Sequence, residues 1–213
     1  MKLIGSQRSP YVRKALVVAA ETGLLGSIDL ELHSVHLAAH SPDVMTFNPL
    51  GKIPTLVLDD GRSLFDSLVV CSFLARRAGR DDLWPTDGEQ QLKVMQRHAL
   101  ANGLIDISIL RLVEAAKPTE RQWPDVIASC DIKIGSVLDF AERGCTALQA
   151  EGCTIGTLSL AVALNYLDFR FSFLDWRRQR PALAGWHAAF VAMPALRDNP
   201  FEDAAPDLAG KVR

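Results

Sequence analysis

The amino-acid sequence predicts two domains, a small α/β domain followed by a larger all-helical domain. Up to about residue 78, short strand-like segments alternate with amphipathic helical stretches, whereas beyond residue 88 only helical spacing remains. Residues 79–88 between them are rich in Gly, Asp and Pro and show no apolar periodicity. Such a segment is typical of a domain boundary.

The first part of the chain begins with an apolar strand over residues 2–5. An amphipathic stretch from Pro10 to about Thr22 predicts a helix, which Gly23 would end. Alternating character over residues 29–35 then predicts a second strand, half buried against helices. The order so far is β-α-β.

A turn-forming cluster over residues 48–51 introduces the second part of this domain. Residues 55–58 and 63–65 flank Asp59-Asp60-Gly61, and this pattern predicts an antiparallel hairpin. A third helix is expected to open at Asp66 and Ser67 and to run to about Ala78. The domain therefore closes with the order β-β-α.

Long segments with helical spacing, separated by Pro or Gly, make up the rest of the chain. They cover residues 89–116, 119–143, 154–173 and 181–192. The tail from Pro194 contains three prolines and is expected to be a loop or a short helix packed on the body.

Composition narrows the class of function. The formal net charge is −2 and there is no dense Lys/Arg cluster, so we expect neither nucleic-acid nor membrane-surface binding. No apolar run approaches the roughly 20 residues needed to span a bilayer, and the sequence starts without a signal-like segment. We therefore expect a cytoplasmic protein.

Metal, nucleotide and disulfide chemistry find no support in the motifs. His33, His36 and His40 lie close together without a metal-binding pattern, and no phosphate-binding glycine motif is present. The four cysteines form no Cys-x-x-Cys pair and lie in apolar or helical contexts, which predicts reduced structural thiols.

Three motifs could bind a ligand. In the first, Ser9 fits a helix N-cap and Pro10 the first helical position, so that free N–H groups and the positive end of the helix dipole face an anion such as a thiolate. The second, Asn48 to Pro54, places a proline directly before a strand, and sequence alone predicts a trans Ile53–Pro54 bond. In the third, Ser67 is expected to be an N-cap beside the Asp66 carboxylate. Each motif alone fits simple capping or turn formation.

Together, in this order and spacing, the motifs resemble the glutathione S-transferase superfamily, and most closely a bacterial serine-type branch. The matching signatures are Ser-Pro-Tyr-Val-Arg-Lys at 9–14, Asn-Pro-Leu-Gly-Lys-Ile-Pro at 48–54 and Phe-Asp-Ser at 65–67. The resemblance extends along essentially the whole chain and includes residues 165–170. It implies the glutathione-transferase fold, with an α/β thioredoxin-like glutathione-binding domain over 1–78, a linker over 79–88 and an all-α domain over 89–213 that forms the electrophile pocket.

The resemblance also implies roles for individual residues. Ser9 would donate a hydrogen bond to the glutathione thiolate, and the backbone of Ile53, before a cis Pro54, would pair with the cysteinyl unit. Asp66 and Ser67 would bind the γ-glutamyl end of glutathione. Asp66 would pair with its ammonium group, and Ser67 would bind its carboxylate. Ser9 would thus be the catalytic residue of an enzyme that activates glutathione for attack on an electrophilic, mostly apolar small molecule.

Several alternatives stay open at this stage. Ser6 and, less well, Tyr11 are rival hydroxyls for the thiol, and Lys52, with His40 and Arg8 behind it, is the candidate cation for the glycine carboxylate. The activity could instead be glutathione-dependent reduction, peroxidase chemistry or isomerisation, or the chain could be a non-catalytic binding module of the same fold. The resemblance further implies a homodimer and a role in detoxification, and the missing motifs described above predict that the protein uses no metal and no nucleotide cofactor.

One position departs from the family's pattern. Family members often have a Ser/Thr-x-x-Asp capping box at the start of the central helix, whereas this chain has Thr154-Ile155-Gly156-Thr157. Thr154 can still cap, and Cys153 with Leu158 can form a hydrophobic staple, but the carboxylate is missing. We expect this change to concern folding and not activity.

Overall fold

A computed structural model describes residues 1–36 and 39–203, which group into two compact units. The first unit combines Met1–Thr86 with the C-terminal segment from Pro194, and the second is Asp87–Met193. The division falls inside the segment 79–88. The tail differs from the sequence-based partition, because it joins the first unit and not the helical one. Its helix α9 (Pro194–Arg197) packs on α1 (Pro10–Glu21).

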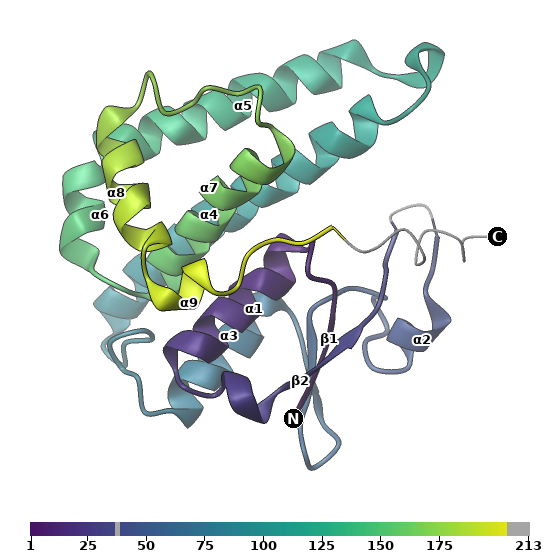
Figure 1. Ribbon diagram of the computed structural model, residues 1–213, viewed down its shortest axis with the longest axis vertical. Helices are drawn as coiled ribbons and strands as arrows, with labels where there is room; N and C mark the ends of the chain where they lie inside the picture. Colours follow the sequence, from purple (N-terminus) through teal and green to yellow (C-terminus); the bar gives the residue numbers. More distant parts are fainter. Residues whose placement is uncertain (37–38, 204–213) are drawn as a thin grey trace. The chain divides into compact units, whose positions relative to one another are not determined.

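The first unit contains four strands, β1 (Lys2–Gly5), β2 (Asp29–Leu32), β3 (Thr55–Val57) and β4 (Ser63–Leu64). They form a mixed sheet in the order β2-β1-β3-β4 (Figure 1). Strand β1 pairs in parallel with β2 and antiparallel with β3, which pairs antiparallel with β4. Helices α1 and α3 (Ser67–Arg77) pack against each other. The order of the elements along the chain confirms the predicted β-α-β followed by β-β-α.

The strand directions bring the three motifs to one edge of this sheet. Because β3 runs against β1, the register places Ile4, near the end of β1, opposite Thr55, the first residue of β3. Because β4 runs against β3 in turn, its last residue, Leu64, lies opposite Leu56. Residues 6–9, 52–54 and 65–67 therefore leave or enter the sheet at the same edge, and α1 and α3 both begin there.

Helix α1 begins and ends where its sequence predicts. Pro10 occupies the first turn, where its missing N–H has no intrahelical role. The helix ends at Glu21 with Thr22 as its C-cap, and Gly23 follows with a φ of 72°, a conformation that glycine adopts without a steric penalty. Eight of its twelve residues are buried, which fixes the helix firmly in the unit.

The second unit is helical throughout its described elements (Figure 1). Its α-helices are α4 (Gly88–Ala115), α5 (Pro124–Arg143), α6 (Cys145–Glu151), α7 (Ile155–Arg170) and α8 (Pro181–Val191). Helix α7 packs on α4 and α8, and most of its residues are buried, so it forms the core of the unit. Gly156 is essential to this packing, because a Cβ there would lie 2.7 Å from the Val94 carbonyl oxygen of α4.

The start of α7 shows how the missing carboxylate is replaced. Thr154 accepts a hydrogen bond from the Thr157 backbone N–H at 3.2 Å, and the Thr157 hydroxyl accepts one from the Thr154 backbone N–H at 2.8 Å. The capping box is therefore complete with two threonines. Thr157 is fully buried, so a hydroxyl meets this requirement without burying a charge.

Two short helices have no counterpart in the sequence-based prediction. Helix α6 occupies residues that were left between two longer helical segments, and α2 (Pro42–Met45) lies in the segment expected to be a connection. Both span only one or two turns, a length at which apolar periodicity carries little information.

Candidate functional site

Ser9 is the N-cap of α1, as the sequence predicts. Its Oγ accepts a long hydrogen bond, 3.4 Å, from the backbone N–H of Val12. A hydroxyl can donate one hydrogen bond while it accepts others. Within residues 1–36 and 39–203, no protein atom accepts a hydrogen bond from this hydroxyl, and Ser9 is partly exposed. Its proton is therefore available to a ligand at the positive end of α1.

The rival hydroxyls have different surroundings. Ser6 precedes a tight turn, in which the Ser9 backbone N–H donates to the Ser6 carbonyl oxygen at 3.0 Å. The Tyr11 ring lies beside the ammonium of Lys14, whose Nζ is 5.7 Å from the ring centroid. Of these three residues, Ser9 alone occupies the helix cap.

Asn48 fixes the loop that leads to Ile53, a role that the sequence analysis did not assign. The residue is 1% exposed, and its Nδ2 donates to the Lys52 carbonyl oxygen at 3.0 Å while its Oδ1 accepts from the Leu50 backbone N–H at 3.0 Å. Gly51 adopts a φ of 61° inside this loop. The Asn-Pro-x-Gly motif could have predicted this role, because asparagine side chains commonly form hydrogen bonds with the backbone of the turn that they begin.

The bond between Ile53 and Pro54 is cis, so the trans form predicted from general frequencies is wrong here and the form implied by the resemblance is present. A second cis bond joins Phe65 and Asp66. Among the residues that the structure describes, neither the N–H nor the C=O of Ile53 has a hydrogen-bond partner. Ile53 thus offers an open backbone edge directly before β3.

The start of α3 corrects one expectation. Asp66, and not Ser67, is the N-cap, because its Oδ1 accepts from the Leu68 backbone N–H at 3.0 Å. Ser67 is the first residue of the helix and is 2% exposed. No partner for its hydroxyl lies within the described part of the chain. The Ser67 hydroxyl oxygen is not fully sealed from solvent, so it can form a hydrogen bond with a ligand at the start of α3.

The Asp66 carboxylate keeps capacity for a cation. Asp66 is exposed, and Leu68 occupies only one of its oxygens. A carboxylate presents several lone-pair positions, so the second oxygen can accept from an ammonium group. Asp66 and Ser67 together therefore match an amino acid end, with a carboxylate for its ammonium and a hydroxyl at a helix N-terminus for its carboxylate.

The candidate cations are distributed unevenly. Lys52 is exposed, and no carboxylate of the described residues pairs with it. Arg8 is also exposed, but its Nη2 donates to the Ser34 Oγ at 3.3 Å. His40 is exposed and lies outside the helices and strands. Lys52 precedes Ile53 directly, so it is the cation that lies beside the open backbone edge.

A metal site does not emerge from the described residues, none of which form a group of three His, Cys, Asp or Glu side chains able to hold a metal. His33 instead lies 2.7 Å from Glu31, which also pairs with Lys2 at 2.7 Å. The hydrogen bond from Lys2 is the main cause that lowers the pKa of Glu31. This cluster is a surface ion pair at the outer strand of the sheet.

The buried thiols are poor nucleophiles. Burial raises the pKa of Cys71 in α3 to about 12, against a nearby lysine that acts in the opposite direction. Desolvation also raises the pKa of Cys145. A cysteine in its thiol form is far less reactive than a thiolate, so neither residue is suited to redox chemistry.

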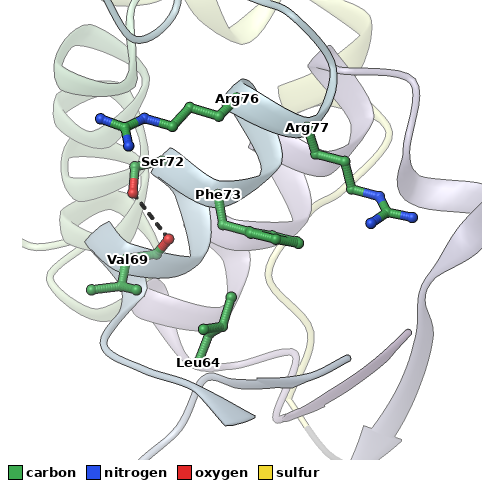
Figure 2. A pocket seen from close by; sticks show the side chains of 6 residues that line it. All are labelled: Leu64, Val69, Ser72, Phe73, Arg76 and Arg77. Carbon is green, nitrogen blue, oxygen red and sulfur yellow. Dashed lines mark hydrogen bonds between the residues drawn. The ribbon is translucent and has the colours of Figure 1, made fainter. Parts of the chain in front are cut away.

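A shallow groove of about 500 Å³ lies over α3 and β4 (Figure 2). Leu64, Val69 and Phe73 give it an apolar surface, and Arg76 and Arg77 project from the same helix. The Arg77 guanidinium lies 6.0 Å from the Phe73 ring centroid. The groove is lined by none of Ser9, Ile53, Asp66 or Ser67 and is thus distinct from the sheet edge described above.

Comparison with known proteins gives the family. Residues 8–77 match the model of the glutathione S-transferase N-terminal domain. An uncharacterised GST-like protein of Escherichia coli K12, YibF, is 32% identical over 187 residues, which cover 86% of this chain and 90% of that protein. The chain belongs to the glutathione S-transferase family.

Solved structures of glutathione S-transferases agree with this assignment. A family member from Pseudomonas fluorescens Pf-5 with bound glutathione has a TM-score of 0.90 and 33% identity, over 95% of this chain and 99% of that one. A glutathione S-transferase from Methylobacillus flagellatus KT, also with glutathione bound, has a TM-score of 0.82 and 34% identity, over 93% and 98% of the two chains. The glutathione-transferase fold, with a thioredoxin-like domain and a helical domain, is therefore confirmed.

In this glutathione S-transferase family member, every residue expected to bind glutathione lies at or beside one sheet edge. Ser9, Ile53 and Ser67 each retain hydrogen-bonding capacity that no described protein group uses. The N-termini of α1 and α3 add positive electrostatic potential to the same edge. The arrangement suits an extended ligand with several anionic groups.

Proposed function

We propose that the protein is a glutathione transferase that binds glutathione along this sheet edge and activates its thiol. The thiolate attacks an electrophilic carbon, a C–S bond forms, and a leaving group departs with its bonding electrons. Where the electrophile is an activated double bond, water instead supplies a proton to the resulting carbanion. The enzyme's task is to keep the sulfur ionised and in position.

The observation that carries this proposal is the set of unused hydrogen-bonding groups at a single edge. Ser9 offers a proton, Ile53 offers a backbone N–H and C=O, and Ser67 offers a hydroxyl that no described protein group uses. Each of these groups can bond a ligand, and a hydrogen bond to a charged ligand group contributes about 1.5 to 3 kcal/mol. A tripeptide with a thiolate, two amides and a charged amino acid end would satisfy all of them.

The free-energy requirement for thiol activation is within reach of these groups. An ordinary thiol has a pKa near 8.5, and lowering it by about two units takes about 2.7 kcal/mol of preferential thiolate stabilisation. A hydrogen bond from Ser9 to an anion contributes about 1.5 to 3 kcal/mol, and the α1 dipole adds about 0.3 to 1 kcal/mol. The hydroxyl acts as a donor to sulfur and is not itself the nucleophile.

The two ends of glutathione have separate candidate partners. Asp66 and Ser67 would hold the γ-glutamyl ammonium and carboxylate at the start of α3. Lys52 would pair with the glycine carboxylate, since no described carboxylate occupies it. Two solved relatives carry glutathione, and a further structure of the Pseudomonas fluorescens protein carries S-(propanoic acid)-glutathione, which supports a site that accepts a substituted sulfur.

Transfer is favoured over thiol–disulfide exchange by the identity of residue 9. A serine oxygen cannot form a mixed disulfide, and the buried Cys71 has a raised pKa. Glutathione-mediated reduction, peroxidase chemistry and isomerisation remain alternatives, because each could use the same bound thiolate. A binding module without turnover would show glutathione affinity but no thiol activation.

Other expectations stay predictions. The helices of residues 89–213 are expected to supply the electrophile pocket, and a homodimer, a role in detoxification and a cytoplasmic location are expected from the resemblance. Among the described helices, none combines the length and apolar character needed to cross a membrane. Sedimentation at micromolar concentration would test the homodimer.

The experiment that tests the function is calorimetric titration of glutathione into wild type, Ser9→Ala and the matched control Ser6→Ala. The ultraviolet absorbance of the bound thiolate is followed against pH in parallel. We expect all three proteins to bind glutathione. The pKa of the bound thiol should lie below that of free glutathione in wild type and Ser6→Ala, and in Ser9→Ala it should lie about one to two units above the wild-type value. A wild type that does not bind glutathione would contradict the proposal, and a pKa change in Ser6→Ala alone would transfer the role to Ser6.

A further inference from the structure

The segment from Leu196 to Glu202 is anchored along α1 (Figure 1). Arg13 of α1 is only 4% exposed, and its Nε donates to the Asn199 carbonyl oxygen at 2.6 Å while its Nη2 donates to the Leu196 carbonyl oxygen at 3.1 Å. The guanidinium also lies 4.4 Å from the centroid of the Phe201 ring, within cation–π distance. Desolvation by burial lowers the pKa of Arg13 to about 10, which still leaves it charged at neutral pH.

The same segment reaches the loop that carries Ser9. Gln7 Nε2 donates to Glu202 Oε2 at 3.0 Å, and the Glu202 backbone N–H lies 3.5 Å from the Gln7 carbonyl oxygen. Gln7 belongs to the tight turn that the Ser9 backbone N–H closes on the Ser6 carbonyl. The Glu202 carboxylate is therefore hydrogen-bonded to Gln7, which lies two positions before Ser9.

The hydrogen bond from Gln7 does not neutralise the negative charge of the Glu202 carboxylate. Gln7 contributes a neutral amide, and Glu202 is exposed, so the negative charge is neither paired by Gln7 nor excluded from solvent. The groups expected at the start of α1, around Ser9, are a hydroxyl donor and a helix N-terminus, which favour an anion, whereas the carboxylate of Asp66 lies at the start of α3. Glu202 is a fixed negative charge beside an otherwise anion-binding loop.

We infer that Glu202, held by Gln7 and anchored through Arg13, is a specificity-determining residue that disfavours acidic groups on the sulfur-bound side of the substrate. This inference rests on the proposed function, because it places the glutathione sulfur near Ser9. A negative charge near that position repels an anionic electrophile or an anionic S-substituent and leaves neutral ones unaffected. The binding of glutathione itself is affected only weakly, since its charged ends are assigned elsewhere.

The expected effect is moderate, because the carboxylate is exposed. Charges in solvent are screened over about 8 Å at physiological ionic strength, so only a nearby substituent senses Glu202. We expect a selectivity change of about three- to tenfold at low salt that shrinks at high salt.

The experiment compares Glu202→Gln with wild type, because glutamine removes the charge while its oxygen can still accept from Gln7. The probes are S-(2-carboxyethyl)glutathione and S-(2-carbamoylethyl)glutathione, which differ only in the charge of the S-substituent. Calorimetric Kd values are measured for both, and for glutathione, at about 0.02 M and about 0.5 M NaCl. Asp198→Asn is the matched control, since it removes one charge from the same segment, where Asp198 pairs with its neighbour Arg197.

We expect Glu202→Gln to shift the acid-to-amide affinity ratio about three- to tenfold toward the acid at low salt, whereas Asp198→Asn leaves it within about twofold. Glutathione binding with an unchanged ratio in Glu202→Gln, or with an equal shift in Asp198→Asn, would overturn this inference and leave the proposed function standing. A wild type that binds none of the three ligands would overturn both.

Discussion

Two helices of this protein, α1 and α7, begin at a hydroxyl N-cap but use it differently. At α7, the hydroxyls of Thr154 and Thr157 satisfy each other's backbone N–H groups, and Thr157 Oγ1 is also 2.8 Å from the Gly152 carbonyl oxygen. At α1, the Ser9 hydroxyl only accepts a long bond from Val12 and donates to no described protein atom. The same chemical group is saturated in one place and available in the other.

The difference teaches how to separate a structural cap from a functional one. The α7 cap is buried and its hydrogen bonds are complete, so it can contribute only to stability. The α1 cap is partly exposed, and Ser67 at the start of α3 has a hydroxyl without a partner among the described residues. Changes at α7 should therefore lower the free energy of unfolding, whereas changes at α1 and α3 should lower ligand affinity or thiol activation.

The largest expected effect on stability is at Gly156 in α7. Gly156→Ala would place a Cβ 2.7 Å from the Val94 backbone oxygen, and because a backbone atom cannot move aside easily, α4 and α7 must separate. We expect the free energy of unfolding in urea to fall by about 3 kcal/mol. Gly103→Ala in α4 is the control, because nothing lies within 4 Å of its Cβ, and it should be neutral or slightly stabilising. Equal effects of the two changes would show that helix packing is not the cause.

The second effect is loss of the capping box through Thr157→Val. The substitution keeps the shape but removes the acceptor for the Thr154 backbone N–H, which is buried at the start of α7. We expect about 2 kcal/mol of destabilisation, measured by urea unfolding, with the glutathione Kd and thiol pKa unchanged. Thr157→Ser retains the hydroxyl and should cost clearly less. A Thr157→Val protein with normal stability would mean that the capping box contributes little.

Much of this comparison was predictable from the sequence, because local signals decide local structure. Ser9 before Pro10 and Thr154 before an apolar run both specify helix starts, and both were assigned correctly. The signal at Asp66-Ser67 was weaker, since aspartate and serine are equally good caps, and the choice between them was wrong by one residue.

Features that depend on distant residues could not be predicted in this way. The cis Ile53–Pro54 bond is uncommon by general frequency, and only the resemblance implied it. Contacts of Arg13 with Leu196 and Asn199 join segments more than 180 residues apart, so no local pattern reveals that the tail belongs to the first unit. The open backbone edge at Ile53 likewise depends on the folded surroundings, in which no described residue pairs with its N–H or C=O. The local sequence does not show this.

The smallest expected effect on the free energy of unfolding is at Ser67, a position that separates a structural hydroxyl from a ligand-binding one. Ser67→Ala removes a hydroxyl that has no described protein partner, so the free energy of unfolding should change by less than about 0.5 kcal/mol. The glutathione Kd should rise about tenfold, the loss of one hydrogen bond to a charged ligand group. Ser72→Ala is the matched control on the same helix, because the Ser72 hydroxyl already donates to the Val69 carbonyl at 3.0 Å. If Ser67→Ala destabilises the protein and leaves the Kd unchanged, the Ser67 hydroxyl is structural, and the start of α3 resembles α7 more than α1.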